Sequence, residues 1–241
     1  MGSTFALADL HGQGKLWDKI KFFLHREDKL IFLGDAIDRG PEGIRIMEEM
    51  LKDERVVYLK GNHEKMMADA LQEDKVDSND FDNRYIWMRN GAQSTYADWL
   101  NRGSDYQWIR RLRQLPVLVR FTNIQDQKIE LSHAGFTPGG RPADAYSLVW
   151  DREHFTEKIP DGNQTVVVHG HTPNIYLTKR FDEINSFYKT AKYPYENRDG
   201  AIFYAGNRKI DIDCGCFITG HTVLLDLNTW ETIGFDAEIE E

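Results

Sequence analysis

The sequence predicts an α/β fold that begins with a parallel sheet and ends in short antiparallel strands. Apolar runs typical of buried strands alternate with helical patterns over residues 4–71. A helical stretch follows, and short strand patterns dominate from residue 201 onward. The chain has 241 residues, of which 41% are hydrophobic and 29% charged, a composition typical of globular proteins. We therefore expect a single domain over residues 1–241.

Three strand–helix pairs make up the N-terminal part. The strands are expected at 4–8, 29–33 and 55–59, and the helices at 15–24, 41–51 and 63–71. In the first helix, Leu16, Ile20 and Leu24 recur at helical spacing. Pro41 suits the first turn of the second helix, where a missing backbone N–H costs nothing. Alternation of this kind forms parallel sheets with right-handed crossovers.

The middle of the chain indicates a helical insertion at about residues 75–115. Trp87, Trp99 and Trp108 recur there, with breaks near Gly91 and Gly103. We expect most of these aromatic residues to serve as core. Residues 181–200 are polar and rich in Tyr, Asn and Lys, which predicts a second insertion, a loop over the surface.

Short strand patterns account for most of the remaining chain. They lie at 117–121, 128–131, 165–168, 201–204, 209–212, 223–227 and 229–233. The last four follow one another closely, which predicts a final antiparallel meander. Asn228 and Thr229 suit its last tight turn.

Charge and cysteine content exclude several classes of protein. The formal net charge is −9, which argues against a general nucleic-acid binder, because such proteins carry a basic surface. Cys214 and Cys216 are too few for a disulfide framework, so we expect reduced thiols in a buried strand. No secretory leader or membrane-spanning run is visible, so we expect a cytoplasmic protein with no membrane partner.

Five segments combine an apolar strand with a polar end. They are Asp-Leu-His-Gly at 9–12, Gly-Asp-Ala-Ile-Asp-Arg-Gly at 34–40, Gly-Asn-His-Glu at 61–64, Ser-His-Ala-Gly at 132–135 and His-Gly-His-Thr at 169–172. Each alone has an ordinary explanation, such as a capping carboxylate or a buried histidine. All five follow strands in order, and the carboxyl ends of parallel strands meet at one edge of a sheet. This argues against coincidence and predicts one site.

The residue types at these strand ends favour a metal centre. Asp, Asn and His supply oxygen and nitrogen ligands without thiolate, which suits manganese, iron or zinc. Asp9 and His11 are two residues apart, so an extended backbone would point both to the same side. The candidate ligands exceed what one tetrahedral ion can use, which suits two ions sharing a bridging carboxylate. Asp35 is the natural bridge, because it follows a strand and a glycine.

These motifs resemble those of the calcineurin-like metallophosphoesterases, and within them the phosphoprotein phosphatase group that includes small bacterial and phage serine/threonine phosphatases. The matched motifs extend from residue 9 to residue 171. The resemblance implies a four-layer α/β/β/α sandwich with mixed sheets and a helical insert. It also implies two divalent metal ions, for which manganese fits best and iron or zinc are alternatives.

The resemblance further implies a role for each matched residue. The first metal would be held by Asp9, His11 and Asp35, and the second by Asp35, Asn62, His133 and His171. The substrate phosphate would be bound by Arg39 and by Arg152, in Val-Trp-Asp-Arg at 149–152, together with Asn62 and His63. His63 would be the general acid, oriented by Asp38. A metal-bound water that loses its proton near neutral pH would be the nucleophile.

The expected function is hydrolysis of phosphoserine and phosphothreonine in proteins, with small phosphoesters as further substrates. Many related nucleases and phosphodiesterases have Gly-His-x-His, and Pro173 stands here in place of its second metal-binding His. Glu64 and Asp38 favour the phosphoprotein group over the diadenosine tetraphosphatases. A diadenosine tetraphosphate hydrolase remains the first alternative, and a non-catalytic phosphopeptide-binding module the second. His169 is expected to pack beside the site rather than to bind metal.

Overall fold

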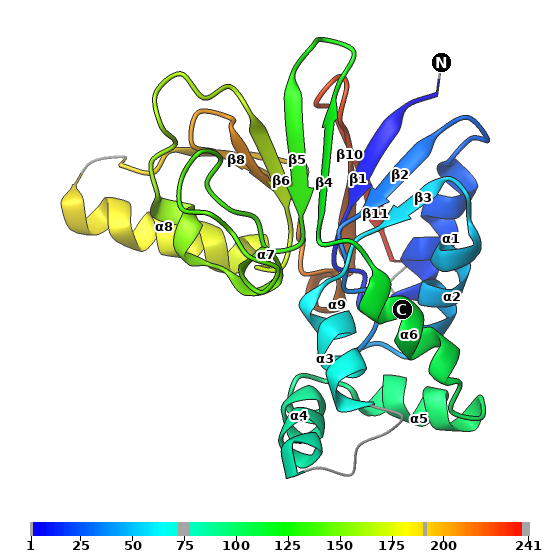
Figure 1. Cartoon of the computed structure of the whole chain (residues 1–241). Coiled ribbons are helices and arrows are strands. Elements are labelled where there is room, and N and C mark those ends of the chain that lie inside the picture. Colours follow the sequence, from blue (N-terminus) through cyan, green and yellow to red (C-terminus); the bar gives the residue numbers. More distant parts are fainter. Residues whose placement is uncertain (1, 72–77, 190–191, 238–241) are drawn as a thin grey trace.

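The computed structural model describes residues 2–71, 78–189 and 192–237. Two mixed β-sheets pack face to face, with helices on their outer sides (Figure 1). This arrangement agrees with the expected α/β sandwich of mixed sheets. No helix in the described part of the chain combines the length and the apolarity that crossing a bilayer requires.

The first sheet has the strand order β11-β10-β1-β2-β3. Its centre is parallel, with β1 (Thr4–Leu7), β2 (Lys29–Phe32) and β3 (Val56–Tyr58) in register. The crossovers run through α1 (Gly14–Phe23) and α2 (Gly43–Lys52), and α3 (Asn62–Ala70) follows β3. Helix α1 buries Leu16, Trp17 and Ile20 at helical spacing against this sheet. The predicted strand–helix alternation is confirmed.

The second sheet has the order β4-β5-β6-β9-β8-β7. Its strands are β4 (Leu118–Thr122), β5 (Lys128–Ser132), β6 (Val166–His169), β7 (Tyr195–Arg198), β8 (Ala201–Tyr204) and β9 (Lys209–Asp211). Strands β5, β6 and β9 are parallel, so their carboxyl ends point the same way. The core between the sheets joins Ala6 and Ile31 of the first sheet to Leu131 and Val168 of the second. This core fixes the two sets of strand ends relative to each other.

The predicted C-terminal meander is wrong. Strands β7, β8 and β9 do pair antiparallel, but β10 (His221–Asp226) and β11 (Thr232–Asp236) belong to the other sheet. Strand β10 pairs antiparallel with β1, where Phe5 faces Asp226. The local pattern of a strand specifies its two faces and not its pairing partner. Asn228 and Thr229 do lie in the turn between β10 and β11.

The loop expected over residues 181–200 is also wrong. Helix α8 (Asn174–Tyr188) continues through the first half of that range, and β7 occupies much of the second, while residues 190–191 lie outside the described residues. Leu177 and Phe181 form the buried face of α8, one turn apart. Few residues of this helix are buried, and many polar residues lie between them, which made the segment look like a loop.

Three helices occupy the region of the predicted helical insertion. They are α4 (Ser78–Arg89), α5 (Gln93–Asn101) and α6 (Tyr106–Gln114), and they lie below the first sheet in Figure 1; residues 75–77 lie outside the described residues. Trp87 and Trp99 are buried among them, as expected of core residues. The Asp105 carboxylate caps α6 by accepting a hydrogen bond from the backbone N–H of Gln107 at 2.8 Å.

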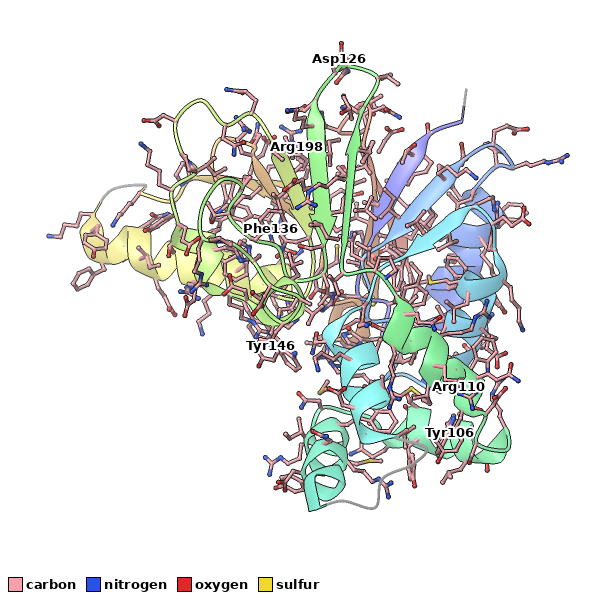
Figure 2. All side chains as sticks on the ribbon, viewed as in Figure 1. Tyr106, Arg110, Asp126, Phe136, Tyr146 and Arg198 are labelled. Atoms are coloured by element: carbon pink, nitrogen blue, oxygen red, sulfur yellow. The ribbon has the colours of Figure 1, made fainter. Side chains whose placement is uncertain are left out.

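Shorter elements lie beside the strand ends. Between β5 and β6 the chain forms α7 (Ser147–Trp150) and a 3₁₀ turn (Glu153–Thr156). Figure 2 labels Phe136 and Tyr146 in the same connection. After β9 comes α9 (Cys216–Thr219). Cys214 and Cys216 are both free and buried, as expected, but they lie after the strand, and Cys216 starts the helix.

Candidate metal centre and phosphate site

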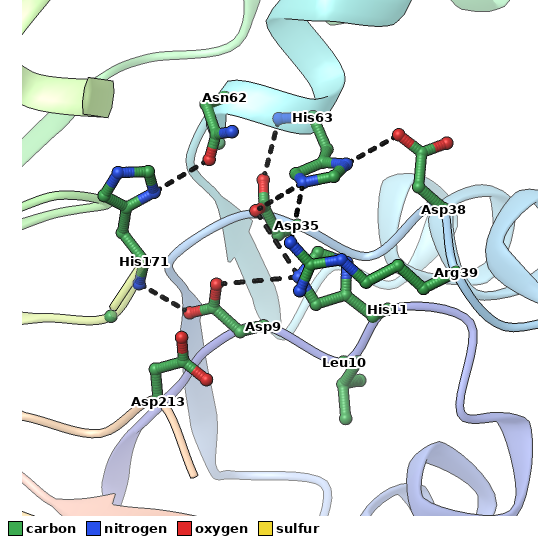
Figure 3. Close-up of polar contacts among 12 residues, drawn as sticks. Asp9, Leu10, His11, Asp35, Asp38, Arg39, Asn62, His63, His171 and Asp213 are labelled. Atoms are coloured by element: carbon green, nitrogen blue, oxygen red, sulfur yellow. Dashed lines mark hydrogen bonds and ion pairs between the residues drawn. The ribbon is translucent and has the colours of Figure 1, made fainter. Parts of the chain in front are cut away.

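The strand ends of both sheets converge on one buried cluster (Figure 3). Asp9 and His11 follow β1, Asp35 follows β2, and Asn62 begins α3 directly after β3. From the second sheet, the predicted ligands at 133 and 171 follow β5 and β6. All six side chains are buried. The structure therefore brings together every residue that we predicted as a metal ligand.

Asp35 lies at the centre of this cluster. Its Oδ2 lies 3.4 Å from Nε2 of His133, 3.6 Å from Nε2 of His11 and 3.8 Å from Nε2 of His63. Its Oδ1 accepts a hydrogen bond of 3.0 Å from the backbone N–H of His63. Burial alone would raise the pKa of Asp35, but the three histidines outweigh it and hold the pKa well below its usual value. Asp35 is thus a carboxylate that faces ligands on both sides, as a bridging ligand would.

The surroundings of Asn62 fit a bound cation. Its Oδ1 lies 2.7 Å from Nε2 of His133 and 2.9 Å from Nδ1 of His171. The Nδ1 of His133 already donates to the backbone carbonyl of Leu33 at 2.9 Å. A neutral His133 ring therefore turns the lone pair of Nε2 toward the Asn62 oxygen, so that two acceptors face each other. A metal ion bound by both atoms removes this conflict.

Asp9 and His11 complete the cluster in the same way. His11 uses Nδ1 to donate to the carbonyl of Ile37 at 3.0 Å, which leaves the Nε2 lone pair facing the site. Asp9 accepts the backbone N–H of His171 at Oδ2, at 3.0 Å, while its buried Oδ1 has no hydrogen-bond partner. Burial raises the pKa of Asp9 well above its usual value, and nearby carboxylates add to this. A carboxylate in this position requires a cation.

Two groups of side chains within the cluster have the spacing of metal ligands. In each group the candidate ligand atoms lie within 4.8 Å of one another, and the groups are Asp9, Asp35 and His133, and His11, Asp35 and His63. The donor set contains carboxylate and imidazole groups without thiolate, which suits borderline divalent metals. The residues present therefore fit a divalent metal site that shares Asp35.

The backbone reaches this geometry through left-handed turns. Positive φ angles between 42° and 71° occur at Asp9, His11, Asp35, Asp38, Arg39 and His171. Such conformations are costly for non-glycine residues and cluster at functional sites. Our reason for the common orientation of Asp9 and His11 was therefore wrong: both face the site, but from a turn rather than from an extended strand.

His63 lies between a carboxylate and a guanidinium. Its Nδ1 lies 2.6 Å from Oδ2 of Asp38, and its Nε2 lies 3.2 Å from a terminal nitrogen of Arg39. Burial lowers the pKa of His63, but the charges of Asp35 and Asp38 outweigh this effect and raise it. A histidine held by a carboxylate at Nδ1, with Nε2 facing the site, has the geometry of a proton donor.

The helical insertion holds the loop that carries Asp38 and Arg39, a contact that the sequence did not suggest. Thr95 Oγ1 accepts a hydrogen bond from the backbone N–H of Asp38 at 2.8 Å. The carbonyl of Gly91 accepts one from the backbone N–H of Arg39 at 2.7 Å. The indole N–H of Trp87 donates to Oδ2 of Asp38 at 2.8 Å. We expected Trp87 to be core; together with Thr95 and Gly91 it also positions the predicted acid and phosphate-binding residues.

Glu64 is a second residue whose role the sequence did not reveal. Its buried carboxylate accepts the backbone N–H groups of Asp35, Ala36 and Gly61 at 2.8 to 2.9 Å, and the hydroxyl of Tyr58 at 2.8 Å. By accepting from the N–H of Gly61, it satisfies the backbone donor of the N-cap residue at the start of α3. The contacts to the turn after β2 fix the position of Asp35 relative to that helix.

The two predicted phosphate-binding arginines line one cleft of about 650 Å³ together with His171. Arg152 is held by Thr172, whose Oγ1 accepts from its Nε at 2.9 Å. The guanidinium of Arg39 lies over the ring of Phe217, 4.2 Å from its centroid. Phe217 was not singled out from the sequence, because a lone aromatic residue carries no motif.

His169 and Asp213 lie beside the cluster. Nε2 of His169 lies 2.7 Å from the hydroxyl of Tyr204, and the ring packs in the second sheet, as expected. Asp213 is buried next to Asp9 (Figure 3), and burial raises its pKa to about 6. Asp213 was not among the predicted site residues, although it begins the Asp-Cys-Gly-Cys stretch at 213–216.

Comparisons with known proteins agree with this geometry. The family model of calcineurin-like phosphoesterases matches residues 3–224. The chain is 27% identical to serine/threonine-protein phosphatase 2 of Escherichia coli strain K12, over 76% of this chain and 82% of the relative. It is 24% identical to an asymmetrical bis(5'-nucleosyl)-tetraphosphatase of Anoxybacillus flavithermus, over 60% of this chain and 64% of that protein.

Among solved structures, a putative diadenosine tetraphosphatase superposes with a TM-score of 0.59 at 17% identity, covering 98% of this chain and 94% of that one. A serine/threonine phosphatase from Saccharomyces cerevisiae gives a TM-score of 0.56 at 12% identity, covering 100% and 81%. At these identities the likeness concerns the fold.

Proposed function

Because the chain belongs to the calcineurin-like phosphoesterase family, we propose that it is a metal-dependent phosphatase acting on phosphoserine and phosphothreonine in proteins. The observation that carries this proposal is the central position of Asp35, with histidine nitrogens on three sides and the cleft of Arg39 and Arg152 beside it. Hydrolysis of phosphoesters itself follows from the family and from relatives named as phosphatases.

We infer that two divalent ions, manganese by preference, are held by the ligands named above. Asp35 would be shared, with Asp9 and His11 on one side and Asn62 and the two histidines of the second sheet on the other. When bound, the ions supply a nucleophile at neutral pH and positive charge for the phosphate oxygens.

The chain's own residues would perform the remaining steps. The planar guanidinium groups of Arg39 and Arg152 bind phosphate oxygens through paired hydrogen bonds and compensate the charge that develops during transfer. His63, kept protonated by Asp38, would give the proton of Nε2 to the departing serine or threonine oxygen. Both His63 and Asp38 are buried, which shields the contact between them from solvent.

Hydrolysis of an aryl phosphate by metal-depleted and manganese-loaded protein tests the proposal. We expect activity only after metal is added, and a loss of at least about a thousandfold in Asp35→Asn, because a shared ligand serves both ions. Asp126→Asn, at the tip of the β4–β5 hairpin (Figure 2), is the matched control and should behave as wild type. Full activity of Asp35→Asn would contradict the site assignment.

A dinucleoside polyphosphate hydrolase is the second candidate, since several relatives are named bis(5'-nucleosyl)-tetraphosphatases. It would use the same metal site. Comparing kcat/KM for a phosphoserine peptide and for diadenosine tetraphosphate separates the two functions. A higher value for the peptide supports our proposal, and a higher value for the dinucleotide replaces it with the alternative.

A further inference from the structure

Four arginines line the cleft over the candidate site. They are Arg39, Arg89, Arg152 and Arg180. The described lining of the cleft contains no aspartate or glutamate, although the whole chain has a formal net charge of −9. A concave surface of one sign, in a protein of opposite net charge, concentrates and orients oppositely charged ligands.

The additional two arginines come from different elements. Arg89 is the last residue of α4 in the helical insertion, and Arg180 lies on α8, which covers the second sheet. The cleft thus has one added cation from each half of the molecule, with the proposed phosphate-binding pair Arg39 and Arg152 also lining it. One phosphate monoester does not use four guanidinium groups, so the cleft has positive charge left over.

Arg89 and Arg180 also have no acidic partners among the described residues. Arg45, by contrast, contacts the carboxylates of Asp18, Glu42 and Glu49 on the surface. Among the described residues, no carboxylate lies within ion-pair distance of Arg89 or Arg180. Arg89 has a neutral neighbour, since its guanidinium donates to the hydroxyl of Tyr85 at 3.1 Å. That contact holds the side chain without compensating its charge.

We propose that Arg89 and Arg180 bind a second anionic group of the substrate, a phosphate or a carboxylate, while Arg39 and Arg152 hold the phosphate that is cleaved. The inference rests on the proposed phosphatase function and names the class of substrate: phosphoesters that carry another negative charge near the reacting group. Two sources have this chemistry. One is a phosphopeptide with a second phosphorylated or acidic residue, and the other is the phosphate chain of a dinucleoside polyphosphate.

The test compares substrates that differ in one charge. The first peptide has a single phosphoserine and neutral neighbours, the second adds a phosphoserine nearby, and the third adds a glutamate instead. Diadenosine tetraphosphate covers the nucleotide source, and an aryl phosphate measures hydrolysis without a second anion. The readout is kcat/KM of each dianionic substrate divided by that of the neutral peptide or the aryl phosphate.

We expect wild type to prefer the substrates with a second anion, and Arg89→Gln with Arg180→Gln to lose about tenfold of that preference per arginine, since a charge-assisted hydrogen bond contributes about 1.5 kcal/mol. The matched control is Arg84→Gln with Lys179→Gln, which removes the same charge from the same two helices outside the cleft. This control should keep the wild-type preference.

The outcomes separate the subsite from the function and the two sources from each other. Loss of preference among the peptides supports the subsite with a peptide ligand, and loss on the tetraphosphate alone supports it with a nucleotide ligand. An unchanged preference in Arg89→Gln with Arg180→Gln, or an equal loss in the control, overturns the inference. Wild type that hydrolyses none of the substrates with manganese would instead overturn the proposed phosphatase function.

Discussion

Oδ2 of Asp38 lies 2.6 Å from Nδ1 of His63, at the boundary between the metal cluster and the helical insertion. The carboxylate fixes the ring so that Nδ1 carries a proton and Nε2 faces the site. Trp87 donates to the same carboxylate oxygen at 2.8 Å, from α4 of the insertion. The proposed general acid is therefore oriented by residues of two separate parts of the fold.

The first prediction concerns the indole N–H of Trp87. Trp87→Phe removes this hydrogen bond and lets the Asp38 carboxylate move, so His63 loses part of its orientation. We expect about a tenfold lower kcat on an alkyl phosphate, whose leaving group needs a proton, and a smaller effect on an activated aryl phosphate. Steady-state kinetics on both substrates measures the ratio, with His63→Asn as the reference for complete loss of the acid.

Trp99→Phe is the control for this prediction. Trp99 is also buried in the insertion, and its N–H donates to the carbonyl of Asp105 at 3.5 Å, away from the cluster. It should destabilise the fold to a similar extent without changing the ratio between the two substrates. Equal losses on both substrates in Trp87→Phe would mean that Trp87 acts through stability alone.

Much of the candidate site was predictable from the sequence because its residues occupy strand ends. An apolar run followed by Asp, Asn or His indicates where a strand stops, and parallel strands bring such ends together. Asp9 and Asp35 meet for this reason, whereas His133 follows a strand of the second sheet and reaches them through the packing of the two sheets, which the sequence did not predict. The residue types then indicate the class of metal.

The supporting residues could not be predicted because they reach the site from segments without a motif. Thr95 and Trp87 contact Asp38 across about fifty residues of sequence, through an insertion whose pattern indicates only buried helices. The pairing of β10 with β1 joins opposite ends of the chain, and alternation of apolar residues does not encode a partner. Helix α8 was mistaken for a loop because its buried face consists of few residues.

The second prediction concerns Glu64, whose carboxylate is the acceptor in all four of its hydrogen bonds. In Glu64→Gln an amide N–H must face a donor, so at least one buried group loses its partner. We expect the free energy of unfolding to fall by about 2 to 4 kcal/mol and manganese to bind more weakly, because the turn carrying Asp35 is released. Urea unfolding of the metal-free protein and calorimetric titration with manganese measure the two effects.

Tyr58→Phe is the matched control, because it removes a single donor to Glu64 and leaves the backbone contacts intact. It should cost about 1 kcal/mol and leave manganese affinity near the wild-type value. Unchanged metal affinity in Glu64→Gln would show that the carboxylate stabilises the fold without positioning the ligands.

The third prediction concerns Lys209, which is fully buried in β9. Its ammonium donates to Oγ1 of Thr137 and to the carbonyls of His154 and Glu157, so it fastens the turn that follows Arg152. Burial lowers its pKa to about 8, and at neutral pH the group still carries its proton. In Lys209→Met these acceptors lose their donor, and we expect about 3 kcal/mol lower stability and a severalfold higher KM.

Lys158→Met is the control for Lys209, since this nearby lysine is exposed and pairs with Asp161 on the surface. It should change neither stability nor KM appreciably. A Lys209→Met protein that is less stable but has an unchanged KM at low temperature, where it remains folded, would contradict a role in positioning Arg152.

The last prediction concerns the pH dependence of stability at His221, on β10. Its Nδ1 lies 2.8 Å from the Asp236 carboxylate and its Nε2 lies 2.9 Å from the carbonyl of Asp199, so both contacts are donated together only by the protonated ring. Burial lowers the pKa of His221, but these partners outweigh it and raise the pKa above its usual value. Stability from this group is therefore complete below the unfolded-state pKa of about 6.5, and it is lost as the pH rises through the folded-state pKa.

His221→Gln should lower the free energy of unfolding by about 0.5 to 1 kcal/mol at pH 5.5 and by less at pH 8.5, measured by urea unfolding at both pH values. An equal cost of His221→Gln at both pH values would contradict the charged contact.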